Sequence, residues 1–180
     1  MKHSDRVNKL LSSIERADRQ LDTVEKVDYI LNCCKELFEF QTSRKRYGGS
    51  PENPISLDSI SADASRASDE IYTIWRIASC LKKAKSNGVV VPLPTWVEKY
   101  IDMRVSYYIK LKLPKIVPQD DTPSVRRIRS AGESLSRLLD LDMYFDIQVP
   151  HINQIKKLRE TIQQYWVFGG HMGISESDES

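Results

Sequence analysis

The sequence predicts an all-α protein, a single domain of five or six helices that form a helical bundle. Apolar residues recur at helical spacing along most of the 180 residues. Capping residues, glycines and prolines stand where these stretches begin and end. Only two segments also fit a short strand, residues 108–113 and residues 143–149. A chain of this length buries about 70% of its unfolded surface, so it needs neither disulfides nor metals to fold.

Residues 1–41 form an amphipathic stretch that is interpreted as one long helix or as a helical hairpin. Leu21, Asp22 and Glu25 fit a hydrophobic staple followed by a capping box, which favours a break near residue 22. The apolar steps of three and four are close to a heptad repeat, so this stripe is expected either in the core or against another helix. The stripe comprises Val7, Leu10, Leu11, Ile14, Ala17, Leu21, Val24, Val27, Leu31, Cys34, Leu37 and Phe38.

Residues 59–168 are expected to form the helical body, after a loop at residues 42–58 that is rich in glycine and proline. Asn87 and Gly88 predict the end of one helix, Thr95 with Glu98 the start of the next, and Pro150 the start of the last. The four helices are expected from residue 59 or 61 to 87, from 95 to 113, from 122 to about 142, and from 150 to 168. Residues 169–180 are expected to be a disordered acidic tail.

The apolar faces of these helices predict the core. On the helix that begins at Thr95, Trp96, Tyr100 and Met103 lie on one strip. Arg104 falls within the same apolar arc, so we expect its guanidinium to form a structural ion pair, with ligand binding as the alternative. Three cysteines without regular spacing are poor material for disulfides, so we expect buried thiols in a cytoplasmic or nuclear protein.

No set of residues points to catalysis, to a metal or to a cofactor. The histidines, His3, His151 and His171, have no ligand partners at the spacing of a metal site. Gly48 and Gly49 are not followed by the Lys-Ser or Lys-Thr of a phosphate-binding loop. No apolar run approaches the roughly 18 residues of a membrane span. We therefore expect a non-enzymatic protein without a membrane segment or a small-molecule substrate.

Charge is distributed unevenly along the chain. Residues 76–137 hold 13 Lys and Arg against 5 Asp and Glu, a local charge of +8, and the remainder holds 14 against 20, or −6. Such a basic segment predicts contacts with nucleic-acid phosphates, and a nearby tyrosine predicts stacking on exposed bases. The candidate nucleic-acid-binding residues are Lys82, Lys83, Lys110, Lys112, Lys115, Arg126, Arg129, Arg137 and Tyr108.

Two other interpretations compete with nucleic-acid binding. In the first, the basic residues form a solvated polar face and the tyrosines lie in the core. In the second, the function resides in residues 5–40, whose amphipathic stripe binds a protein partner or a second copy of the chain without nucleic acid. This second hypothesis describes an adaptor or assembly protein.

Overall fold

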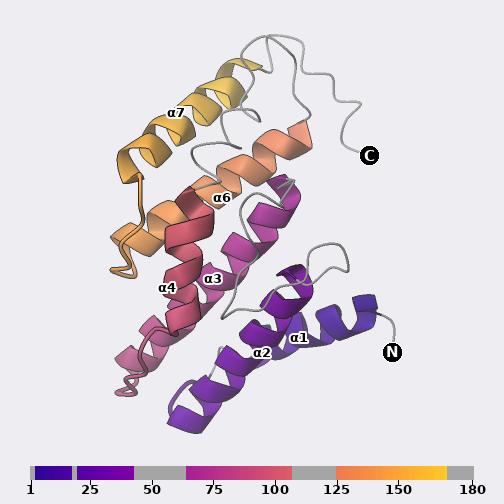
Figure 1. Cartoon of the computed structure of the whole chain (residues 1–180), viewed down its shortest axis with the longest axis vertical. Coiled ribbons are helices and arrows are strands. Elements are labelled where there is room, and N and C mark those ends of the chain that lie inside the picture. Colours follow the sequence, from indigo (N-terminus) through magenta and orange to yellow (C-terminus); the bar gives the residue numbers. More distant parts are fainter. Residues whose placement is uncertain (1–2, 18–19, 43–63, 107–124, 170–180) are drawn as a thin grey trace. The chain divides into compact units, whose positions relative to one another are not determined.

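The protein is an all-α helical bundle in the computed structural model, which describes residues 3–17, 20–42, 64–106 and 125–169 (Figure 1). These residues form six α-helices and one π-helical segment and contain no strand, which confirms the predicted fold class. Residues 108–113 lie outside the described part, and residues 144–149 contain a turn rather than a strand. The elements are α1 (His3–Ala17), α2 (Val24–Thr42), α3 (Ala64–Ser86), α4 (Thr95–Tyr100), η2 (Ile101–Val105), α6 (Val125–Met143) and α7 (Ile152–Gly169).

The chain divides into two compact units. Unit 1 comprises Met1–Ile60 and Tyr72–Tyr100, and unit 2 comprises Ser61–Ile71 and Ile101–Ser180. One boundary therefore falls inside α3 and another at the end of α4. Most of α3 and all of α4 group with the N-terminal helices α1 and α2 in unit 1.

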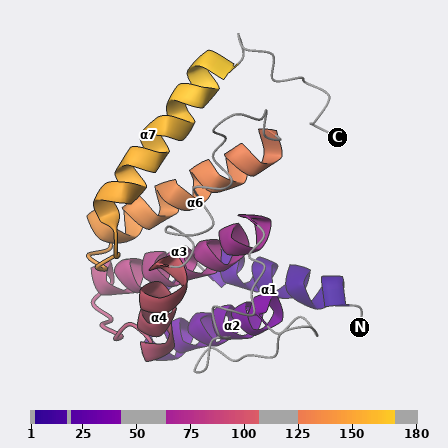
Figure 2. The same ribbon diagram turned by 45° about the horizontal axis from the view of Figure 1, so that its top comes forward.

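The N-terminal residues of unit 1 form a helical hairpin rather than one long helix. Helices α1 and α2 run antiparallel and lie side by side (Figures 1 and 2). Leu21, between them, is fully buried. Thr23 caps α2, because its Oγ1 accepts a hydrogen bond from the Lys26 backbone N–H at 3.3 Å. Asp22 instead forms an ion pair with Lys26 at 2.5 Å, so the cap lies one residue later than expected.

Aromatic rings join α2 to α4 inside unit 1. The fully buried ring of Phe38 lies 5.0 Å from that of Trp96 and 5.1 Å from that of Tyr100, the latter edge-to-face. Such geometries add about 0.5–1.5 kcal/mol per pair to the burial of the rings. The Asn87 side chain also donates to the Leu21 carbonyl at 3.0 Å, which ties the end of α3 to the turn of the hairpin.

The end of α3 confirms the stop predicted at Asn87 and Gly88. Val89 N–H donates to the Ala84 carbonyl at 2.9 Å, and Gly88 N–H donates to the Lys85 carbonyl at 3.0 Å. These two bonds define a Schellman motif, whose penultimate residue adopts the left-handed conformation. Gly88 has a φ of 83°, which glycine adopts without steric cost.

Two residues expected in the core are exposed. Val24 is 50% exposed because α1 already ends at Ala17 and Val24 is the first residue of α2 rather than part of a continuous stripe. Met103 is 41% exposed because α4 passes into the π-helix η2. One turn of a π-helix contains more residues than one turn of an α-helix. The residues after Tyr100 therefore do not lie on the face that α-helical spacing predicts. The side chain of Arg104 lies outside the described part.

Unit 2 contains a second antiparallel pair, α6 and α7, which lie against each other (Figures 1 and 2). Helix α7 begins at Ile152, two residues later than expected, because Pro150 and His151 form a turn in which His151 has a φ of 60°. The predicted apolar faces of both helices supply buried side chains. These are Ala131, Leu135, Leu138, Ile155 and Ile162.

Gly132 marks a close approach of α6 to α7. A Cβ atom added there would lie 3.4 Å from Ile162 Cγ2, an ordinary contact. We expect Gly132→Ala to raise the free energy of unfolding by about 0.5–1 kcal/mol, because alanine costs less backbone entropy in a helix. Gly132→Leu is expected to lower it by about 1–3 kcal/mol through overpacking. Thermal denaturation checks both, and equal destabilisation by the two variants would contradict the packing.

Candidate nucleic-acid interface

The structure places the candidate binding residues in different units. Lys82 and Lys83 are exposed on the last turns of α3 in unit 1. On α6 in unit 2, Arg129 is exposed and Arg137 is half-buried. Arg126 belongs to α6, but its side chain lies outside the described part. The remaining candidates also lie outside the described residues; they are Tyr108, Lys110, Lys112 and Lys115.

Exposed lysines gather at the end of α3. Lys82, Lys83 and Lys85 are all exposed within the last two turns of this helix. Cations in the last turn offset the negative end of the helix dipole, which accounts for their position. The same ammonium groups face solvent, where they can contact phosphates as point charges. The position therefore serves helix stability and leaves the charges accessible to an anion.

A weak ion pair lies on the polar face of α6. Arg137 Nη1 lies 4.0 Å from Glu133 Oε2, four residues earlier in the same helix. Exposed pairs at this spacing contribute about 0.3–0.5 kcal/mol. An anionic ligand of higher charge density competes readily with a pair this weak. Arg137 therefore stays suited to a phosphate contact despite its intramolecular partner.

Three cations on α7 were missed by the sequence analysis. Lys156, Lys157 and Arg159 are exposed, and Glu160 is the one acidic residue of this helix. Among the residues that the structure describes, no carboxylate lies within ion-pair distance of the three. They were not among the candidate residues because they lie beyond the basic segment 76–137. The short run Lys-Lys-Leu-Arg was the signal that could have found them.

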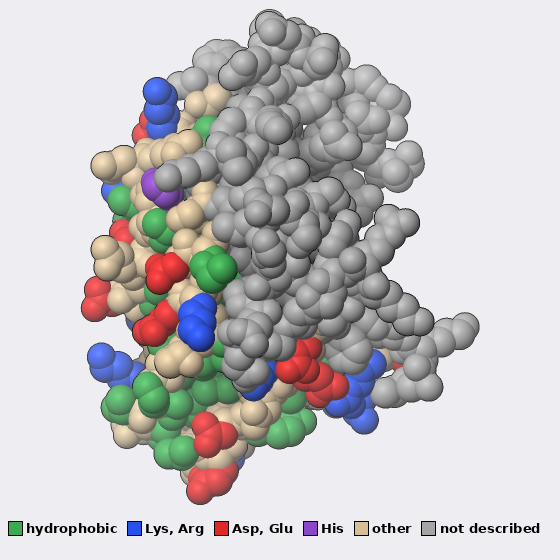
Figure 3. Space-filling view, viewed as in Figure 1, with side chains coloured by type: hydrophobic (Ala, Val, Ile, Leu, Met, Phe, Trp, Pro, Cys, Tyr) green, Lys and Arg blue, Asp and Glu red, His purple; other side chains and the backbone are tan. Residues whose placement is uncertain are grey.

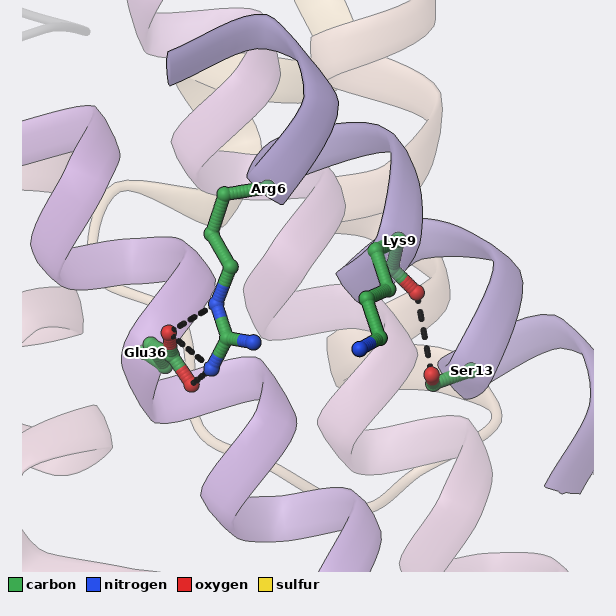
Figure 4. Close-up of polar contacts among 4 residues, drawn as sticks. All are labelled: Arg6, Lys9, Ser13 and Glu36. Atoms are coloured by element: carbon green, nitrogen blue, oxygen red, sulfur yellow. Dashed lines mark hydrogen bonds and ion pairs between the residues drawn. The ribbon is translucent and has the colours of Figure 1, made fainter. Parts of the chain in front are cut away.

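The apolar stripe of α1, which is the basis of the competing hypothesis, is partly buried within unit 1, and Val7 and Leu11 are half-buried. Leu10 is 4% exposed and Ile14 is 3% exposed. A bidentate ion pair also joins α1 to α2: Arg6 Nε and Nη2 each donate to a Glu36 carboxylate oxygen at 2.6 Å (Figure 4). In Figure 4, Ser13 turns back along α1 and donates to the Lys9 carbonyl at 2.9 Å. The stripe therefore contributes to the core.

Exposed apolar side chains occur elsewhere in unit 1. Val24 and Tyr29 on α2 are 50% and 55% exposed, and Val90, in the segment between α3 and α4, is 77% exposed. Figure 3 shows a green area of apolar side chains at the lower left, where α2 begins and α3 ends in Figure 1. Val24 and Tyr29 therefore place exposed apolar side chains on α2 of the N-terminal hairpin.

Charged side chains of both signs are mixed on the described face in Figure 3. Blue Lys and Arg side chains there stand separately among red acidic and green apolar ones.

The cysteines do not form a reactive site. Cys33, Cys34 and Cys80 are buried thiols. Burial raises the pKa of the Cys33 thiol, which disfavours the nucleophilic thiolate at neutral pH. Within the described residues, no group of three or more His, Cys, Asp and Glu side chains could hold a metal ion.

Among the helices of the described part, none combines the length and the apolarity that a membrane span requires.

The fold defines the class of this protein as an all-α helical bundle. The chain matches no protein-family model, no curated protein and no solved structure. Its function is therefore inferred from its own residues.

Proposed function

We propose that this protein is a non-catalytic helical interaction subunit of the cytoplasm or nucleus that contacts nucleic-acid phosphates through its basic central region. The observation that carries the proposal is the exposure of Lys82, Lys83 and Arg129 within a segment whose local charge is +8. Lysine and arginine that neutralise phosphates release condensed counterions, which drives binding to any base sequence. The expected interaction therefore depends on salt and reads little base sequence.

The two kinds of cation have different parts in this binding. Lys82 and Lys83 provide flexible point charges at the end of α3. Arg129, on the exposed face of α6, provides a planar guanidinium that can donate two parallel hydrogen bonds to one phosphate. Neither kind of contact distinguishes one base from another. The proposal thus predicts similar affinities for oligonucleotides of equal length and different sequence.

The test compares Lys82→Gln/Lys83→Gln/Arg129→Gln with the wild type in fluorescence anisotropy titrations of labelled single-stranded oligonucleotides. At about 50 mM salt, we expect the triple variant to bind at least about tenfold more weakly, because three phosphate contacts are lost. The matched control is Lys9→Gln/Arg16→Gln/Lys26→Gln, which removes the same charge from exposed positions outside the basic segment. Equal affinities of the two variants, or no binding by the wild type, would refute the proposal.

The second candidate is an adaptor or assembly protein that acts through its N-terminal helices without nucleic acid. Exposure of Val24, Tyr29 and Val90 favours it, and a second copy of the chain is the simplest partner for such a surface. Deleting residues 1–41 would remove core residues, so point substitutions are the better test. Val24→Ser/Tyr29→Ser is expected to lower the mass measured by light scattering. A wild type that is already monomeric at high concentration removes the second copy as the partner.

A further inference from the structure

Arg159 is held between two helices by neutral partners. Its Nε donates to Ser136 Oγ on α6 at 3.1 Å, and its Nη1 donates to Gln163 Oε1 on α7 at 3.4 Å. Neither acceptor carries a charge, so the guanidinium is oriented but not neutralised. This differs from Arg6, whose guanidinium is bound by the Glu36 carboxylate.

The hydrogen bonds of Arg159 leave donors for an anion. Arginine has five N–H groups, and the two bonds to Ser136 and Gln163 leave the whole Nη2 amino group unused. Ser136 accepts a bond through Oγ and still has its hydroxyl hydrogen to donate. A guanidinium amino group beside a hydroxyl donor fits the oxygens of a phosphate.

Lys156 adds a second cation to the face of α7 that carries Arg159. Lys156 lies three residues before Arg159 and seven before Gln163, so all three project from the same face of α7. Lys157 is one residue further on and projects from a different face. The acids near this face are Glu133, which pairs with Arg137, together with Asp140 and Glu160.

We propose that Arg159, Ser136 and Lys156 form a phosphate-binding position at the junction of α6 and α7, and that its ligand is a backbone phosphate of nucleic acid. Arg159 and Ser136 donate hydrogen bonds to the phosphate oxygens, and Lys156 supplies a second positive charge. This position rests on the proposed function and adds to it two cations, Lys156 and Arg159, from outside the basic segment 76–137.

The experiment compares single substitutions on one helix in the full chain. Arg159→Gln and Lys157→Gln each remove one exposed cation of α7, but only Arg159 touches Ser136. The probe is a labelled single-stranded oligonucleotide at about 50 mM salt. We expect Arg159→Gln to weaken binding about tenfold and to reduce the salt slope by about one, and Lys157→Gln to leave both nearly unchanged. Ser136→Ala, which removes no charge, is expected to weaken binding about fivefold.

Equal effects of Arg159→Gln and Lys157→Gln would overturn the position, because only overall charge would then matter. Unchanged binding by both Arg159→Gln and Ser136→Ala would overturn it as well. If the variant at Lys82, Lys83 and Arg129 still loses affinity in those cases, the proposed function stands without this position. Failure of the wild type to bind removes both. Circular dichroism of each variant verifies that the helices are intact.

Discussion

Phe38→Ala is expected to lower the free energy of unfolding by about 3–5 kcal/mol. Phe38 is fully buried, and its ring contacts those of Trp96 and Tyr100 at centroid distances of 5.0 and 5.1 Å. Truncation removes the apolar surface of the ring and leaves a cavity between α2 and α4, which rigid helices fill only partly. Urea denaturation followed by circular dichroism measures the loss.

The control for Phe38 is Tyr29→Ala on the same helix. Tyr29 is 55% exposed, so its replacement is expected to change the free energy of unfolding by no more than about 0.5 kcal/mol. Both variants delete an aromatic ring from α2, so helix propensity changes similarly in the two. Equal destabilisation by Phe38→Ala and Tyr29→Ala would show that Phe38 does not occupy the core of unit 1.

Leu135→Ala is expected to lower the free energy of unfolding by about 2–5 kcal/mol. Leu135 is fully buried on α6, in unit 2, so it tests a different core from that of Phe38. Alanine favours the helix at least as well as leucine does, so the loss reports on packing rather than on helix propensity. Thermal and urea denaturation both measure it.

Met143→Ala is the matched control for Leu135. Met143 is the last residue of α6 and is 63% exposed, so its truncation is expected to cost at most about 0.5 kcal/mol. A change in Leu135→Ala as small as that in Met143→Ala would contradict the assignment of the buried face of α6.

The helices and most of their buried faces could be predicted from local sequence. The spacing of Leu135 and Leu138 identifies the buried side of α6, and Asn87 with Gly88 identifies the end of α3. These features depend on interactions between residues a few positions apart, which periodicity and capping rules describe. The predicted helix starts differ from the observed ones by one or two residues: the cap of α2 is Thr23, and α7 begins at Ile152.

The register after Tyr100 could not be predicted, because nothing in the local pattern distinguishes a π-turn from an α-turn. Met103 therefore lies on a different face from the one its spacing indicates. The division into units was also inaccessible, since the contacts of Phe38 with Trp96 and Tyr100 join residues about sixty positions apart.

Of the candidate interface, only the excess of positive charge could be predicted from the sequence. Counting residues finds the basic segment with Lys82, Lys83 and Arg129, which the structure shows to be exposed. The pairing of Arg159 with Ser136 depends on the packing of α6 against α7, and no count of charges reveals it. Sequence therefore indicates which cations are abundant, while the structure indicates which of them is oriented by neutral partners.

Whether the exposed cations bind phosphates is tested most directly by the salt dependence of nucleic-acid binding by the full chain. The logarithm of the association constant for a single-stranded oligonucleotide is expected to fall linearly with the logarithm of salt concentration, with a slope of about −0.7 for each phosphate contacted. An affinity that stays constant as salt rises would contradict the claim.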